Sequence, residues 1–268
     1  MYLADYHTHT YLCKHAEGAP ADYLAAAEKA GLAELGVADH FPWPDGYDPQ
    51  CRMFTEEYPR YHDMVMELRN SHHSVKVKYG IELDYVPGRM DEVFAHAAEY
   101  DYDYIIGSIH YTDDFPFDSP EHIEVWKDAE KSEQIWTRYY ELLLEFVSLG
   151  GFDIIGHFDL PKKFGSIQPD TGKINRLIDE ILTAAADNSL ALEINTGGLR
   201  QPGGKMYPSP EILEEAAAKG LKLTLGSDAH APDQVSANFA DALVLAEDAG
   251  FTELTLFEQR SPRLLPLS

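Results

Sequence analysis

Seven of the twelve histidines in this 268-residue chain lie at or just beyond the ends of apolar, strand-like runs. One glutamate and one aspartate occupy similar places, which gives nine candidate ligands: His7, His9, His15, His40, Glu82, His110, His157, Asp228 and His230. Neutral imidazole and carboxylate commonly bind zinc, manganese and iron. Without a cation, nine such groups meeting in one pocket would each need another buried partner. The set therefore predicts a metal site rather than isolated, hydrogen-bonded core residues.

The spacing of two pairs supports this prediction. Residues i and i+2 of a β-strand point to the same side, so His7 and His9 can face one interior together. Asp228 and His230 repeat the arrangement near the other end of the chain. The remaining histidines fall in helical or loop segments and are predicted to be surface residues: His62, His72, His73, His96 and His122.

The elements that must position the candidate ligands are seven apolar, β-rich runs. They cover residues 2–7, 32–40, 75–85, 102–111, 152–160, 190–197 and 221–230. Stretches with helical spacing lie between them, for example 21–31, 175–188 and 210–220. This alternation favours an α/β fold with a buried parallel sheet.

Seven strand–helix units favour a closed TIM-like barrel in one domain, residues 1–268. The short run 252–257 is a candidate eighth strand. In such a barrel, the C-terminal ends of the strands converge on one face, where active sites form. The candidate metal site is therefore expected on that face. Two long connections, 41–58 and 112–128, are expected to act as functional loops near it.

Composition restricts the class of partner. The chain has 21 basic and 46 acidic residues and a formal charge of −25, which disfavours nucleic acid and anionic membranes. A small anionic ester could still be attracted to a local group of cations. Two cysteines, no run of 18 apolar residues and no secretory signal predict a cytoplasmic protein. The sequence does not predict an oligomeric state.

Taken in order, the motifs resemble those of the PHP (polymerase and histidinol phosphatase) family. They are DYHTHT (5–10), His15, VADHF (37–41), GIELDY (80–85), GSIHY (107–111), GHFDL (156–160), EIN (193–195) and GSDAH (226–230). The resemblance runs along nearly the whole chain and implies a distorted (β/α)7 barrel, in agreement with the seven units. It is greatest to the stand-alone histidinol-phosphate phosphatases of histidine biosynthesis.

The resemblance also implies three divalent ions, which could be zinc, manganese or iron. One would be held by His7, His9, Glu82 and Asp228, a second by Glu82, His110 and His157, and a third by His15, His40 and His230. Glu82 would bridge the first two ions. Cys13 is expected to remain an uncoordinated thiol, because the implied ligand set is complete without it.

Two cations resemble the family's phosphate-binding residues, namely Arg200 after the sixth run and Lys162 after the fifth. Lys163 could serve instead of Lys162, and a solvated surface lysine is an equal alternative. The planar guanidinium of Arg200 suits bidentate phosphate contact.

Three polar residues lie beside candidate ligands at strand ends: Asp39, Asp159 and Asn195. We expect them to orient imidazoles through hydrogen bonds. Asp39 could instead protonate a leaving group.

These features predict a phosphomonoesterase that hydrolyses L-histidinol phosphate to L-histidinol and phosphate. A hydroxide bridging two ions would attack phosphorus, without a covalent phosphoenzyme. One alternative is a family phosphoesterase for another small ester, of nucleotide or phosphotyrosine type. A second is an inert metal-binding protein. An amidohydrolase-type enzyme is less favoured, because Glu82 fills the place of its usual bridging carbamylated lysine.

Overall fold

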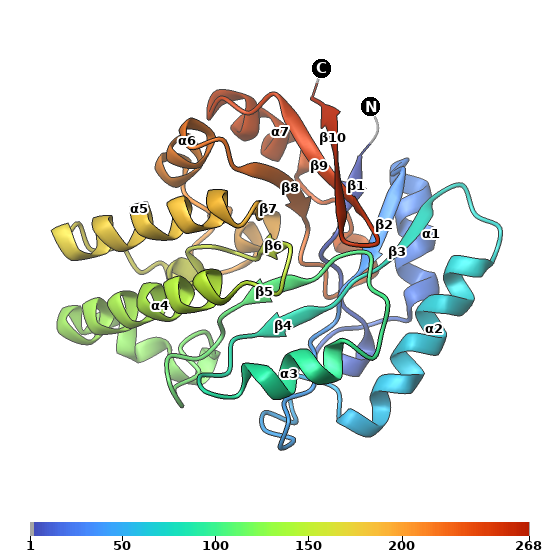
Figure 1. The fold of residues 1–268 in the computed structure, drawn as a ribbon, viewed down its shortest axis with the longest axis horizontal. Coiled ribbons are helices and arrows are strands. Elements are labelled where there is room, and N and C mark those ends of the chain that lie inside the picture. The colour runs from blue at the N-terminus through green and yellow to red at the C-terminus, as the bar shows by residue number, and fades with distance from the viewer. Residues whose placement is uncertain (1–2, 268) are drawn as a thin grey trace.

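The computed structural model describes residues 3–267 and has an α/β fold in which helices surround short parallel strands (Figure 1). Tyr2, the first residue of the predicted run 2–7, and the chain ends Met1 and Ser268 lie outside the described residues. The parallel strands are β1 (Ala4–Asp5), β2 (Glu34–Val37), β3 (Lys76–Tyr79), β4 (Glu82–Asp84), β5 (Ile106–Ser108), β6 (Ile154–Ile155), β7 (Ala191–Asn195) and β8 (Lys222–Gly226). Every predicted run thus contains at least one strand.

The strands form two parallel sheets, ordered β1-β2-β3 and β4-β5-β6-β7-β8. Two isolated parallel bridges lie at the strand ends: Thr8 with Ala229, just beyond β1 and β8, and His40, just beyond β2, with Glu82, the first residue of β4. The predicted run 75–85 is split into β3 and β4. The break falls at Gly80, where a Cβ atom would overlap the ring of Tyr104. The chain changes its strand partner at this crowded point.

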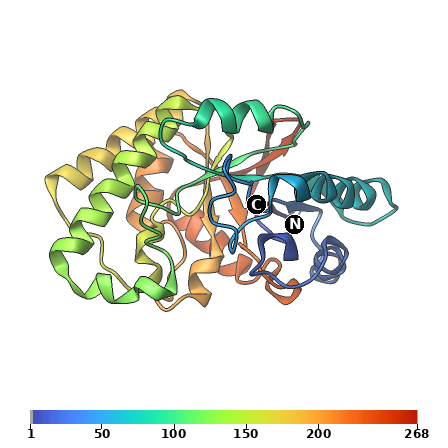
Figure 2. The same cartoon turned by 90° about the horizontal axis from the view of Figure 1, so that it is seen from below.

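The helices lie around the strands, as two perpendicular views show (Figures 1 and 2). They are α1 (Pro20–Ala30), α2 (Tyr58–Asn70), α3 (Met90–Ala97), α4 (Ala129–Leu149), α5 (Gly172–Asp187), α6 (Pro210–Ala218) and α7 (Phe239–Asp248). The three predicted helices correspond to α1, α5 and α6. Gly31 caps α1 in a left-handed conformation with φ 72°, as expected at a helix end. Among the described residues, no helix is long and apolar enough to cross a membrane.

Short 3-10 helices follow several strands and contain Cys13, Lys162 and Arg200. They are η1 (Tyr11–Cys13), η4 (Leu160–Phe164), η5 (Thr196–Arg200) and η6 (Pro232–Gln234). The two long predicted connections contain η2 (Thr55–Glu57) and η3 (Pro120–Lys127).

The C-terminal run does not extend a parallel sheet. It forms β9 (Glu253–Glu258), which pairs antiparallel with β10 (Ser261–Pro266), so its prediction as an eighth barrel strand is wrong. Leu256 and Phe257 instead pack in a small core with Tyr6, Tyr104 and Ile154. The physical reason is local: a two-residue turn at Gln259 and Arg260, both with positive φ, reverses the chain at once.

Candidate metal centre

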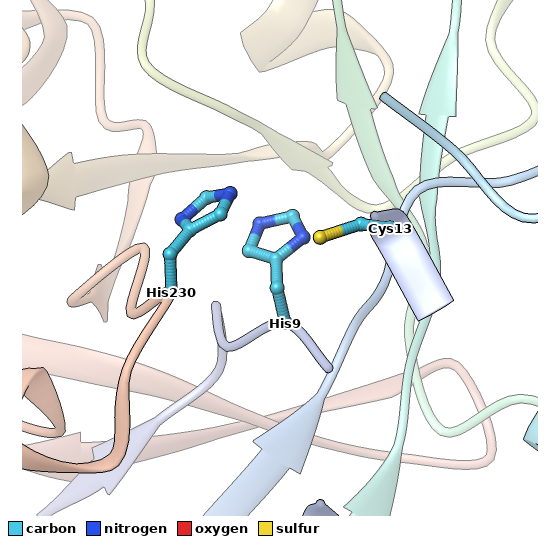
Figure 3. A group of neighbouring side chains, drawn as sticks. All are labelled: His9, Cys13 and His230. Carbon is cyan, nitrogen blue, oxygen red and sulfur yellow. The ribbon is translucent and has the colours of Figure 1, made fainter. Parts of the chain in front are cut away.

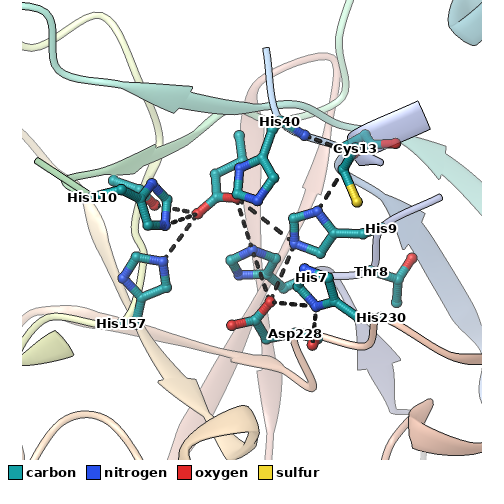
Figure 4. A network of polar contacts seen from close by, with 12 residues as sticks. His7, Thr8, His9, Cys13, His40, His110, His157, Asp228 and His230 are labelled. Atoms are coloured by element: carbon teal, nitrogen blue, oxygen red, sulfur yellow. Dashed lines mark hydrogen bonds and ion pairs between the residues drawn. The ribbon is translucent and has the colours of Figure 1, made fainter. Parts of the chain in front are cut away.

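The nine predicted ligands converge in one cluster, although they are spread over more than 220 positions of the sequence. Figure 4 labels seven of them, all except His15 and Glu82. Most follow the C-terminal end of a strand, as predicted. Glu82 differs, because the break at Gly80 makes it the first residue of β4. His7, His9, Glu82 and His157 are buried, whereas His15 is exposed at the outer edge.

Glu82 lies at the centre of the cluster and is fully buried. Its Oε2 atom is 2.8 Å from Nδ1 of His40 and 3.4 Å from Nε2 of His7. Its Oε1 atom faces the other side, 3.0 Å from Nε2 of His157 and 3.7 Å from Nε2 of His110. One carboxylate thus presents each oxygen to a different set of imidazoles, which is the arrangement needed to bridge two cations.

Asp228 extends the group on the side of His7 and His9. Its Oδ1 atom lies 3.2 Å from Nε2 of His9 and 3.8 Å from Nε2 of His7. The backbone of Asp228 is left-handed, with φ 52°, a conformation that most residues avoid and that is often found at functional sites. Asn195 donates a hydrogen bond of 3.3 Å to Oδ2, which fixes the carboxylate of Asp228 beside the imidazoles.

A third group consists of His15, His40 and His230. The Nδ1 atoms of His15 and His230 lie 2.8 Å and 3.0 Å from the backbone oxygens of Cys13 and Asp228. These contacts turn the two Nε2 atoms toward each other, 2.9 Å apart. Backbone acceptors favour protonation at Nδ1, which leaves a lone pair on each Nε2 atom. Two lone pairs at this distance suit a shared cation.

The donor chemistry of the whole cluster fits divalent cations. Nε2 of His7 and Oε2 of Glu82 are buried and make no hydrogen bond with any described residue. Buried polar atoms without a partner are unfavourable, and a cation between them would satisfy both. Among the described residues, five groups of ligand atoms lie within 4.8 Å of one another. Three of them fall within the ligand sets that the sequence implies: His7, His9 and Glu82; Glu82, His110 and His157; and His15, His40 and His230. The other two are His40, Asp84 and His110, and His9, Cys13 and His230.

Cys13 lies at the edge of the same cluster. Its side chain is fully buried and forms a further group of metal-ligand type with His9 and His230 (Figure 3). Burial raises the pKa of the thiol far above its ordinary value, which favours the neutral form over the thiolate that binds metal. That Cys13 stays uncoordinated remains a prediction.

Buried carboxylates orient several of the imidazoles. Glu193 accepts a hydrogen bond of 2.7 Å from Nδ1 of His7, and Asp84 lies 2.7 Å from Nδ1 of His110. Asp39 is 3.5 Å from Nδ1 of His9. Each contact directs the opposite ring nitrogen toward the cluster.

Sequence reasoning missed Glu193 and Asp84. The same-face rule could have found both, since Asp84 is two residues from Glu82 and Glu193 is two residues from Asn195. Gly226 makes room for Glu193, because a Cβ atom there would overlap Oε1 of that glutamate.

Arg52 was also missed, and it anchors the connection 41–58 to the cluster. Its buried guanidinium donates a hydrogen bond of 2.7 Å to Oδ2 of Asp84 and others of 3.1–3.2 Å to Asp48. It also donates to the backbone oxygen of Phe41 at 3.1 Å. The side chain of Asp84 therefore joins Arg52 to His110. An arginine in a Pro-rich loop carries no sequence signal of such a contact.

Of the other predicted site residues, Arg200 lies beside the cluster, whereas Lys162 and Asp159 face a separate cavity. Arg200 donates hydrogen bonds of 2.7 Å and 2.8 Å to the backbone oxygens of Ser227 and Asp228, so it is beside a candidate ligand. Lys162 pairs with Asp159 at 2.7 Å, and both line a separate cavity of about 850 Å³. Within residues 3–267, no hydrogen bond or ion pair joins the side chains of this pair to the nine candidate ligands.

Electrostatic shifts within the cluster have opposite directions. Burial lowers the pKa of His40 to about 4. Burial acts in the same direction on His9, but Asp228 and Asp39 outweigh it and raise the pKa to about 9. Asp84 and Glu82 outweigh burial in the same way at His110, whose pKa also rises to about 9. At neutral pH, the cation-free protein is therefore expected to carry protons on His9 and His110.

Cation binding should release these protons, because only neutral imidazole can bind a metal. We expect zinc added to metal-free protein near pH 8 to acidify a weakly buffered solution, since that pH lies below the pKa of about 9 of both rings. The release should shrink as the starting pH passes about 9. A pH-stat titration measures it, with zinc-loaded protein as the control. The expectation would be contradicted if no protons are released near pH 8, or if as many are released above pH 9 as near pH 8.

The fold and the cluster define a class: α/β proteins in which parallel strands present a histidine- and carboxylate-rich group of metal-ligand type. Comparison with known families narrows the class. A model of the PHP domain matches residues 5–197, and the chain belongs to the PHP domain family. The matched segment contains seven of the nine candidate ligands, and Asp228 and His230 follow it.

Relatives match over almost the whole chain. The probable histidinol-phosphatase of Deinococcus radiodurans is 38% identical over 254 residues, covering 94% of this chain and 96% of the relative. The histidinol-phosphatase of Bacillus subtilis is 29% identical and covers 86% and 94%. The crystal structure of a histidinol phosphate phosphatase from Lactococcus lactis, complexed with zinc, L-histidinol and phosphate, has a TM-score of 0.78 at 24% identity and covers 97% and 98%. This last similarity supports the fold.

Proposed function

We propose that this protein hydrolyses L-histidinol phosphate to L-histidinol and phosphate, a reaction of histidine biosynthesis. The observation that carries the reaction class is Glu82, whose two oxygens face separate groups of imidazoles. The choice of substrate rests on the relatives, which are named as histidinol-phosphatases and match this chain over most of their length.

We further propose that the nine candidate ligands hold three divalent cations at the C-terminal face of a distorted (β/α)7 barrel. The isolated bridges beside β1 and β8 and beside β2 and β4 support closure of the two sheets into one barrel within a single domain, 1–268. Zinc, manganese and iron all suit ligand shells of imidazole and carboxylate. When bound, the cations would supply a nucleophile at neutral pH and offset charge on the phosphoryl oxygens.

The chain's own residues would position the ester. Arg200 is exposed beside Asp228 and has further N–H donors to offer to phosphoryl oxygens. Lys162 lines the separate cavity, whereas Lys163, on the same 3-10 helix, pairs with Asp118, on which His110 and His157 act electrostatically. This difference supports Lys163 as the better second phosphate contact. Asp39 accepts hydrogen bonds from both the backbone and the hydroxyl of Thr10. These contacts support orientation of His9 as its role, rather than protonation of the leaving group.

The acidic chain disfavours nucleic acid as a partner. A small anionic ester remains the proposed substrate. The cytoplasmic location, inferred partly from the cysteine content, stays a prediction; both cysteines are free.

A comparison of substrates tests the proposal. We expect the metal-loaded protein to release phosphate from L-histidinol phosphate with a higher kcat/KM than from p-nitrophenyl phosphate, phosphotyrosine or a nucleoside monophosphate. The reason is that specific contacts to the leaving portion favour one transition state over the others. A colorimetric phosphate assay measures all four. Equal rates would favour a general phosphoesterase, and a fully loaded but inactive protein would favour the metal-binding alternative.

A further inference from the structure

The connection between β5 and α4 reaches the edge of the candidate metal centre at Asp118. The preceding residue, Phe117, is fully buried and packs edge-on against Tyr139, with ring centroids 5.4 Å apart. Tyr139 in turn donates a hydrogen bond of 3.3 Å to the backbone oxygen of His157. Phe117 therefore anchors this loop beside the end of β6, and Asp118 follows directly.

Asp118 and Lys163 form an ion pair at this edge. The Nζ atom of Lys163 is 3.1 Å from Oδ2 of Asp118, and the side chains of Lys163 and Asp118 are 19% and 21% exposed. Burial raises the pKa of Asp118, but Lys163 outweighs it, with smaller effects from His110 and His157, and the net shift is downward. A negative and a positive charge thus stand together within reach of solvent, and His110 and His157 lie close enough to act on Asp118 electrostatically.

We propose that Asp118 determines specificity by accepting the ammonium group of a 2-aminoalkyl phosphate, while Lys163 faces its phosphoryl group. This inference rests on the proposed function and adds the substrate class that the site prefers. In such an ester, only the ester oxygen and two carbons separate phosphorus from the nitrogen. The substrate therefore carries two opposite charges close together, and the ion pair offers the complementary arrangement.

The pair also explains how the site can distinguish esters. Cations and a lone lysine would attract any small phosphomonoester alike. A carboxylate built to bind an ammonium group disfavours an analogue without nitrogen, because its charge then loses a partner on binding. Asp118 would act on the leaving portion, away from the reacting phosphorus.

Two substrates and three variants test this role. The substrates are L-histidinol phosphate and the analogue in which hydrogen replaces the amino group, 3-(imidazol-4-yl)propyl phosphate. In Asp118→Asn, we expect kcat/KM for the amino ester to fall about 10- to 100-fold, the loss of one charge-assisted hydrogen bond. The fall should appear mainly in KM. The same variant should change kcat/KM for the analogue less than about threefold.

Lys163→Met should slow both substrates, since both carry the phosphoryl group. Asp114→Asn, a matched change at an exposed position of the same loop, should leave both unchanged. Metal content is measured for each variant, so that lost cations are not mistaken for lost specificity.

The outcomes are distinguishable. If Asp118→Asn slows both substrates equally, or neither, Asp118 does not read the ammonium group and the inference fails while the proposed function stands. If the metal-loaded wild-type protein hydrolyses neither ester, the proposed function fails and the inference fails with it.

Discussion

Replacing Glu82 by glutamine is expected to lower metal content and phosphatase activity together, with kcat/KM falling by more than about 100-fold. Removing a residue that only orients a ligand typically costs 10–100-fold, so losing a shared ligand should cost more. The amide keeps the shape of the side chain but loses the charge. It also offers one oxygen where Glu82 offers two, one to each side of the cluster. Metal analysis by mass spectrometry and a phosphate-release assay measure the two effects.

The matched control is Glu214→Gln, the same chemical change at an exposed position of α6. It should leave metal content and activity unchanged. A Glu82→Gln protein that retains both its metal content and its activity would contradict the bridging role. A protein that keeps its cations but loses activity would place Glu82 in the chemistry and not in binding.

The convergence of the nine candidate ligands could be predicted from sequence because it depends on few facts. Apolar runs mark where strands end, and parallel strands of one fold present those ends on the same side. His7 with His9 and Asp228 with His230 then follow from the two-residue period of a strand. None of these steps requires knowledge of side-chain packing.

The parts that sequence reasoning missed depend on contacts between distant segments. The split at Gly80 arises because the ring of Tyr104, two residues before β5, occupies the space of a Cβ atom. The run 252–257 has the composition of a strand, but composition does not tell whether its partner is parallel or antiparallel. Residue types also cannot show that Arg52 crosses from a loop to Asp84.

The orienting carboxylates connect the fold to the chemistry. Glu193 accepts a hydrogen bond of 3.0 Å from the backbone nitrogen of His157 while it also contacts Nδ1 of His7. One side chain on β7 therefore fixes both His157, which follows β6, and His7, which follows β1. Because these imidazoles are held before any cation arrives, the site needs little rearrangement to bind one. A rigid site of this kind should bind cations tightly, which makes their removal a severe perturbation.

Removing the cations with a chelator should abolish activity and lower thermal stability. A ligand that binds only the folded state, at 100 times its Kd, adds about 2.7 kcal/mol, and its loss should lower Tm by roughly 5–10 °C. Adding zinc or manganese back should restore both properties. Calorimetry and phosphate release measure the two, and verified metal-free protein with unchanged Tm and activity would contradict the prediction.

The stability difference between the two forms should also widen as pH rises. In the metal-free protein, the pKa values of His9 and His110 are raised to about 9, above those of unfolded histidine. Their protons therefore stabilise the folded state fully below about pH 6.5, and this stabilisation is lost as pH rises through about 9. In the loaded protein, cations take the place of these protons, so its Tm should fall less over the same range. Tm is measured for the metal-free and the metal-loaded protein between pH 7 and 9.5. If Tm falls equally in both forms over this range, the prediction that cations take the place of protons on His9 and His110 is wrong.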